Sequence, residues 1–88
     1  MITNLSDLKP GDRGVIVEIN TKSSYKLRLA SMGILLGEEV LVLKIAPLGD
    51  PISIKIKGYE LALRKREASC IKIESNRESA KELPTTKV

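Results

Sequence analysis

The feature that most constrains this fold is a single helical stretch in a chain otherwise patterned as strands. The stretch covers residues 25–37. Within it, Tyr25, Leu29 and Met32 fall at i, i+4 and i+7, so a helix places all three on one face. We therefore expect this face, including the ring of Tyr25, to be buried against the rest of the chain.

Both ends of this helix carry sequence signals. Ser23 and Ser24 precede it, and serine hydroxyls accept hydrogen bonds from the first free N–H groups of a helix. Gly33 stands where a helix commonly ends in a left-handed conformation, and Ile34 can then fold back onto Leu29 in a Schellman-type ending. The sequence thus predicts a short helix with a sharply defined end.

Alternating apolar residues predict five short strands, at residues 14–20, 40–46, 52–56, 59–64 and 70–74. In the first strand, Val15, Val17 and Ile19 form a wholly apolar face, while the other face is mixed. The second strand is nearly all apolar, which is typical of a central strand covered on both faces. Turns with glycine and proline join the second, third and fourth strands into two hairpins.

This order of elements predicts a mainly β fold. Five short strands with one short α-helix between the first two fit a small SH3-like β-barrel that removes its free edges by closing on itself. The OB-fold is also a five-stranded barrel, but its main helix usually lies between the third and fourth strands. The helix of this chain comes too early for that fold.

The length of 88 residues leaves room for one domain. We assign residues 1–74 to the barrel and expect residues 75–88 to form a disordered tail, because they hold few large apolar groups. The chain has no Phe and no Trp, so its core must consist of Ile, Leu and Val. Such β-branched residues favour sheet.

The residue types that usually carry catalysis are scarce. The chain has no histidine and one cysteine, Cys70, so it lacks the usual general base, the commonest transition-metal ligand and a disulfide partner within one copy. Gly33 and Gly37 end a helix instead of opening one, so they do not form a phosphate-binding loop. We expect a protein that is not an enzyme and has no cofactor, with its carboxylates solvated instead of binding metal.

The net charge of +4 arises from 15 basic and 11 acidic residues. It suits an acidic protein surface, an anionic membrane surface or weak nucleic-acid contact. Specific readers of single strands stack bases on exposed aromatic side chains, and this chain has two tyrosines. We therefore expect no nucleic-acid partner. Without a secretion signal or a long apolar run, we also expect a cytoplasmic protein with no direct membrane insertion.

Three groups of residues together resemble the ferrous-iron transport protein A (FeoA) family. They are a Pro-Gly start before an Arg-Leu helix that closes in a Gly-Ile step, an Ala-Pro-Leu-Gly-Asp-Pro-Ile segment, and a Leu-Ala-Leu-Arg strand followed by an alanine and the last strand. In this sequence they are Leu5, Leu8, Pro10, Gly11, Arg28, Leu29, Met32, Gly33, Ile34, Gly37, residues 46–52, Gly58, residues 61–64, Ala68 and Ile71. The resemblance covers most of residues 5–74. Leu36 departs from it, because many members have proline there, and so does Leu27, where many have a second arginine.

The resemblance implies an SH3-like domain that acts as a cytoplasmic adaptor or regulator of a FeoB-type ferrous-iron transporter. It would bind the cytoplasmic part of that membrane GTP-binding protein, as a monomer or weak homo-oligomer. Two alternatives stay open. Related barrels are fused to metal-responsive repressors of the diphtheria-toxin-repressor type, so one alternative is a regulatory module with transition metal ion binding. The other is weak nonspecific nucleic-acid binding.

Seven residues are the predicted partner contacts: Arg28, Leu29, Met32, Ile34, Lys55, Lys57 and Arg64. The first four combine an apolar rim with an exposed guanidinium, as docking surfaces often do. The last three belong to the densest basic cluster, which includes Lys65 and Arg66. Each group also has a simpler interpretation: the helix residues close one end of the barrel, and the basic residues form a solvated face that discourages unwanted strand pairing.

Overall fold

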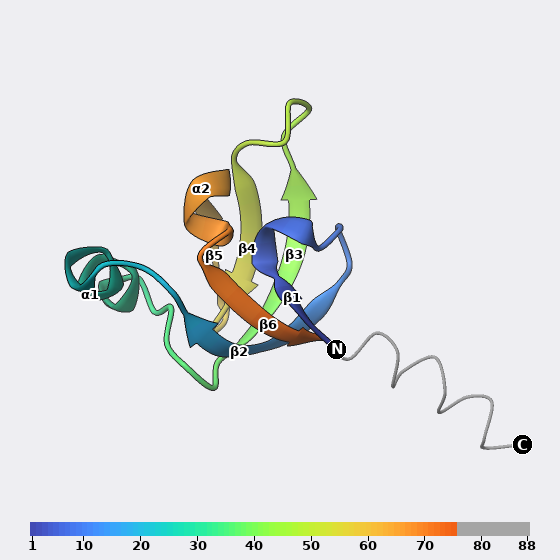
Figure 1. The fold of residues 1–88 in the computed structure, drawn as a ribbon. Helices are drawn as coiled ribbons and strands as arrows, with labels where there is room; N and C mark the ends of the chain where they lie inside the picture. Colours follow the sequence, from blue (N-terminus) through green and yellow to red (C-terminus); the bar gives the residue numbers. More distant parts are fainter. Residues whose placement is uncertain (76–88) are drawn as a thin grey trace, which may run out of the picture.

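The computed structural model describes residues 1–75 (Figure 1). In chain order its elements are β1 (Ile2–Asn4), the 3₁₀ helix η1 (Leu5–Asp7), β2 (Arg13–Ile19), α1 (Ser23–Ser31), β3 (Glu39–Ile45), β4 (Ile52–Ile56), β5 (Tyr59–Leu63), α2 (Lys65–Ala68) and β6 (Ile71–Ser75). The predicted tail lies outside the described residues except for Ser75, the last residue of β6.

The strands form one antiparallel sheet in the order β1-β6-β2-β3-β4-β5, and the sheet curls around a single core (Figure 1). The mainly β fold and both predicted hairpins, β3–β4 and β4–β5, are confirmed. β3 is central as predicted, because it pairs with β2 on one side and β4 on the other. β1 is an additional strand that pairs with β6. Three residues are too few to show an alternating pattern, so β1 could not be predicted from its residues.

The sheet retains two edges, β1 and β5, because no pairing joins these strands within residues 1–75. The expected closure of the barrel by hydrogen bonds is therefore incomplete. The shortness of β1 limits the unpaired backbone that this edge offers to another chain.

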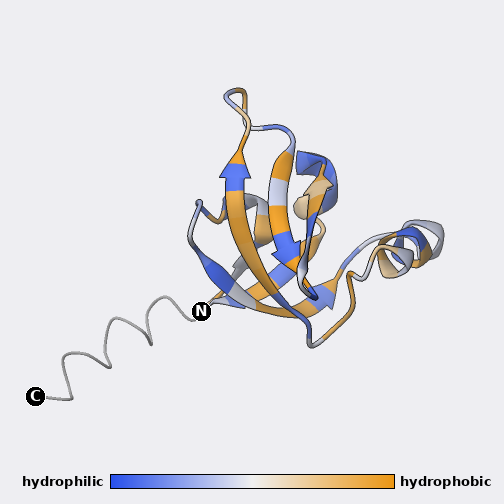
Figure 2. Cartoon of the chain, turned by 180° about the vertical axis from the view of Figure 1, so that it is seen from behind, coloured by the Kyte–Doolittle hydropathy of each residue, from blue (hydrophilic) through white to orange (hydrophobic). Residues whose placement is uncertain are grey.

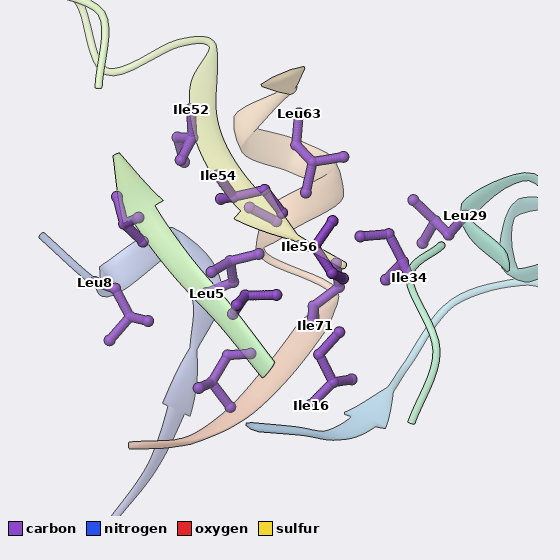
Figure 3. Packing of buried hydrophobic residues seen from close by; sticks show 14 residues of the cluster. Leu5, Leu8, Ile16, Leu29, Ile34, Ile52, Ile54, Ile56, Leu63 and Ile71 are labelled. Carbon is purple, nitrogen blue, oxygen red and sulfur yellow. The ribbon is translucent and has the colours of Figure 1, made fainter. Parts of the chain in front are cut away.

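The core is built from aliphatic side chains. Its 14 members are Leu5, Leu8, Ile16, Leu29, Ile34, Val40, Val42, Ile52, Ile54, Ile56, Leu63, Ala68, Ile71 and Ile73. Alternate residues of β4 and β6 belong to this set, so each of these strands turns one face to the core. Figure 3 shows the side chains converging from all sides of the curled sheet. In Figure 2, hydrophobic residues dominate the sheet, whereas the projecting helix α1 is mixed.

β2 turns a different face to the core than its apolar pattern suggests. Ile16 is 1% exposed, whereas Val17 is 41% exposed. The register of β2 against β6 shifts between Ile16 and Glu18, as at a β-bulge, where the regular alternation of a strand is interrupted. The face formed by Val15, Val17 and Ile19 is thus not the main core face.

The end of α1 has the predicted Schellman geometry. Gly33 has φ +94°, its N–H donates to the Ala30 carbonyl at 2.9 Å, and the Ile34 N–H donates to the Leu29 carbonyl at 3.0 Å. These are the paired bonds that define the motif. Ile34 is fully buried and lies beside Leu29, the buried residue of α1 (Figure 3).

The start of α1 differs from the prediction. Its N-cap is Lys22, which makes no side-chain capping bond. Ser23 and Ser24 lie inside the helix, so the expected serine cap is wrong. The first free N–H groups of α1 are left to solvent, which is acceptable because the first six residues of the helix are exposed.

The helix α1 projects from the sheet (Figure 1), and residues at the tip of the β4–β5 hairpin contact its C-terminal end and the loop that follows. The Tyr59 hydroxyl donates to the Met32 carbonyl at 2.5 Å, and Lys57 Nζ lies 3.0 Å from Glu38 Oε2 in the following loop. Together with the burial of Leu29 and Ile34, these contacts fix the helix relative to the sheet. None of the helices within residues 1–75 is long and apolar enough to cross a membrane.

Candidate partner-binding groove

A groove of about 330 Å³ lies between α1 and α2. We call it the α1–α2 groove, and it is lined by Thr21, Tyr25, Arg28, Leu29, Arg66, Glu67 and Cys70. Its walls are mainly apolar. A mainly apolar concave surface with polar groups at defined positions is typical of a binding site.

One wall of the groove comes from α1. Tyr25, Arg28 and Leu29 stand at i, i+3 and i+4, so they share the helix face that looks toward α2. Leu29 continues into the core at 3% exposure, whereas Tyr25 is 54% exposed. The expectation that Tyr25 is buried is therefore wrong. The projecting helix leaves its first turn beyond the reach of the sheet, and the ring borders the groove instead.

The other wall comes from α2. The N–H of Arg64, the N-cap of α2, donates to Glu67 Oε1 at 2.9 Å, so the Glu67 carboxylate is held at the start of this short helix. Glu67 Oε2 also lies 3.9 Å from Arg28 Nη2. This long ion pair is the polar link across the groove.

Cys70 completes the lining just after α2. Its thiol donates to the Arg66 carbonyl at 3.4 Å, and its side chain is partly exposed. A free cysteine of this kind packs as a small apolar residue. We therefore assign Cys70 to the apolar surface of the groove.

The rim of the groove is positively charged. The Arg28 side chain is 64% exposed in spite of its contact with Glu67. Arg66 is also exposed, and its guanidinium makes no ion pair with any residue that the structure describes. Two guanidinium groups thus face solvent beside one carboxylate, and α1 itself contains no acidic residue. The positive electrostatic potential at this rim favours a negatively charged ligand.

The predicted contacts at the helix differ in exposure and position. Arg28 lies on the groove rim, as its predicted exposure suggested. Leu29 and Ile34 are 3% and 0% exposed, so their assignment as partner contacts is corrected: they are core residues that support the groove from below. Met32 is half-buried and packs against the core, and its carbonyl accepts the bond from Tyr59.

The predicted basic cluster is divided in the structure. Lys55 and Lys57 line a second, more open depression of about 280 Å³, and Lys57 is paired with Glu38. Arg64 lies 3.9 Å from Asp50 of the β3–β4 loop. Of this cluster, Arg66 alone lines the α1–α2 groove. The seven predicted contacts therefore do not form one surface.

The opposite wall of the groove was beyond sequence reasoning. Arg66, Glu67 and Cys70 are far from α1 along the chain, and no local pattern says that α2 packs near α1. The run of charged residues at 64–67 was the available signal, because consecutive charged side chains indicate an exposed segment. No group of three His, Cys, Asp or Glu side chains that could hold a metal ion occurs within residues 1–75.

Comparison with known proteins identifies relatives of this chain. Residues 3–75 match the FeoA domain family. The chain is 36% identical over 70 residues to the Fe(2+) transport protein A/Fe(2+) transporter FeoB fusion protein of Porphyromonas gingivalis. The aligned part is 80% of this chain and 8% of the fusion protein, so the chain spans a small part of this relative.

Solved structures with similar folds include a crystal structure of the iron uptake regulatory protein FeoA. It has a TM-score of 0.80 and 32% identity, and the alignment covers 85% of this chain and 99% of that one. A zinc complex of Stenotrophomonas maltophilia FeoA, described as an SH3 domain protein, has a TM-score of 0.69 and 25% identity, with 82% and 89% covered. The mainly β, SH3-like fold is thus confirmed.

A second group of similar structures consists of transcriptional repressors. A manganese-dependent repressor in complex with manganese has a TM-score of 0.77 and 29% identity, over 84% of this chain and 36% of the repressor. The likeness is therefore to one part of a longer protein. On the family match over residues 3–75 and the identity to the fusion protein, this chain belongs to the FeoA domain family.

Proposed function

We propose that this protein is a cytoplasmic adaptor or regulator of a FeoB-type ferrous-iron transporter, and that it binds the transporter through the α1–α2 groove. The observation that carries the proposal is the fusion protein of Porphyromonas gingivalis, in which an FeoA part and a FeoB transporter share one polypeptide. Fusion keeps two partners at high effective concentration. A separate chain must achieve the same association by a binding surface.

The α1–α2 groove supports this proposal because it has the properties of such a surface. Tyr25 and Cys70 supply apolar surface above the buried Leu29, and Arg28 and Arg66 supply a charged rim, which is the arrangement usual in protein–protein interfaces. Tyrosine and arginine are also the residue types most often found at binding hot spots.

A binding role fits the chemistry of the groove better than a catalytic one. The chain has no histidine, and the Cys70 thiol is engaged with a backbone carbonyl. The Glu67 carboxylate is held by the Arg64 N–H and lies near Arg28. No residue of the groove is arranged as a nucleophile with an adjacent base. We therefore propose that the protein acts through contact alone.

The proposal is tested by measuring the affinity of the full chain for a detergent-solubilised FeoB-type transporter from the same genome. Arg28→Glu reverses one charge on the rim and should weaken binding about tenfold, a change of about 1.4 kcal/mol. Arg13→Glu is the matched control, because Arg13 is exposed at the opposite end of β2 from Thr21. Absence of binding by the unmodified chain would refute the adaptor function.

A second candidate is a metal-responsive regulatory module. It is favoured by the likeness to the manganese-dependent repressor. Titration with Mn²⁺ or Fe²⁺, followed by amide chemical shifts under anaerobic conditions, separates the two functions. A metal site should change the chemical shifts of one compact set of amides, with a stoichiometric end point. An adaptor without a metal site should show no such changes.

A further inference from the structure

We infer that the α1–α2 groove receives a short segment of the partner in which one apolar side chain is flanked by carboxylates. The inference rests on the proposed adaptor function and specifies the chemistry of the segment that is bound. Three features of the groove support it: its size, its apolar lining and the sign of the charge at its rim.

The size of the groove limits the occupant. At about 330 Å³, the volume lies at the lower end of the range for ligand pockets. It has room for one or two side chains but not for a folded element. An apolar side chain placed beside Tyr25 and Cys70 would remove their remaining exposed apolar surface from water. We therefore expect a single anchor residue, such as leucine, isoleucine, methionine or phenylalanine.

The positive charge of the rim favours acidic residues on either side of the bound apolar anchor residue. Arg28 reaches the rim from α1 and Arg66 from α2, so guanidinium groups stand on both walls. Arginine presents planar donors that bind carboxylates through two parallel hydrogen bonds. Both side chains are exposed, so each can turn toward a bound segment.

Glu67 is the acidic group in the groove, and it does not reverse this preference. Its Oε1 accepts the Arg64 N–H at 2.9 Å, whereas its contact with Arg28 is 3.9 Å. The Glu67 carboxylate is therefore anchored in α2, and Arg28 can exchange a long ion pair for a closer one with an incoming carboxylate. A basic segment would meet repulsion from Arg28 and Arg66.

A second copy of this chain is the competing occupant. Leu48, at the tip of the β3–β4 loop, is 95% exposed, and Asp50 follows two residues later. Asp50, however, accepts the Lys65 N–H at 2.9 Å and lies 3.9 Å from Arg64 within its own chain. Because its carboxylate is already engaged, this loop matches the rim less well than a segment with free carboxylates.

The test uses overlapping 12-residue peptides that cover the cytoplasmic sequence of the transporter. Binding of each labelled peptide to the full chain is measured by fluorescence anisotropy at low and high salt. The peptides that bind should carry an apolar residue within two positions of Asp or Glu. Replacing these acids by Asn or Gln should weaken binding about tenfold, and so should Arg66→Glu, because each change removes a charge-assisted hydrogen bond.

Arg13→Glu is the matched control and should leave the affinity within about twofold, since surface charges away from a site have small effects. Circular dichroism confirms that each variant is folded. Neutral or basic peptides as the best binders, or equal affinity for Arg66→Glu and the unmodified chain, would overturn the inference. So would self-association that Leu48→Ala abolishes and that excludes the peptides.

Failure of this inference is distinguishable from failure of the proposed function. If the whole transporter binds the unmodified chain and the Arg28→Glu and Arg66→Glu variants equally, the adaptor function stands and the groove assignment is wrong. If the whole transporter does not bind the unmodified chain, the adaptor function itself is wrong.

Discussion

The hydroxyl of Tyr59 donates a 2.5 Å hydrogen bond to the carbonyl oxygen of Met32, and this bond connects the tip of the β4–β5 hairpin to the C-cap of α1. The last carbonyl groups of a helix have no partner within the helix, so the bond satisfies one of them. It also fixes the end of the helix that forms one wall of the α1–α2 groove. The position of that wall therefore depends on a residue outside the groove.

Tyr59→Phe should lower the free energy of unfolding by about 0.5–1.5 kcal/mol, because it removes this hydrogen bond and little else. Urea denaturation of both proteins measures the difference. Tyr25→Phe is the control, since the Tyr25 ring lines the groove and is half-exposed. An equal effect of the two substitutions would show that the Tyr59 bond does not hold the helix.

Gly33→Ala should destabilise the protein more than Gly37→Ala. Both glycines have positive φ, +94° and +89°, so each substitution costs roughly 1 kcal/mol from backbone strain. A Cβ on Gly33 would also overlap the Tyr59 hydroxyl, whereas a Cβ on Gly37 would meet no atom. The excess cost should disappear when Tyr59 is first replaced by Ala, and its persistence would contradict the clash.

Leu29→Ala should cost about 2–5 kcal/mol of stability, since it leaves a cavity in the core beneath α1. Leu27→Ala in the same helix is the matched control. Leu27 is 73% exposed, so its replacement should change stability by less than about 0.5 kcal/mol. Thermal and urea unfolding measure both. Similar losses would mean that α1 packs on the sheet through a different face.

Much of this fold could be predicted from the sequence because its signals are local. The alternation of Ile52, Ile54 and Ile56 and the Gly33–Ile34 step each specify their own conformation without reference to distant residues. The bulge in β2 could not be predicted, because the exposure of Val17 depends on how β2 pairs with β6.

The groove was less predictable than the fold, because its two walls come from segments that are far apart in the sequence. The exposure of Arg28 followed from its helix position, but its neighbours Arg66 and Cys70 are brought to it by the packing of α2. The exposure of Tyr25 could not be predicted, because helical periodicity places residues on a shared face but does not show how far the sheet extends beneath that face. Leu29 lies above the core, and Tyr25, one turn earlier, lies beyond it.

The most direct measurement of the central claim is the rate at which Cys70 is alkylated by iodoacetamide. Cys70 is the one cysteine of the chain and lines the α1–α2 groove, so its reaction reports on the groove alone. At a free transporter concentration of about ten times the Kd, mass action leaves about a tenth of the chain unbound, and the rate should fall about tenfold. An unchanged rate, with co-elution showing that the transporter is bound, would contradict the claim that the groove is the binding site.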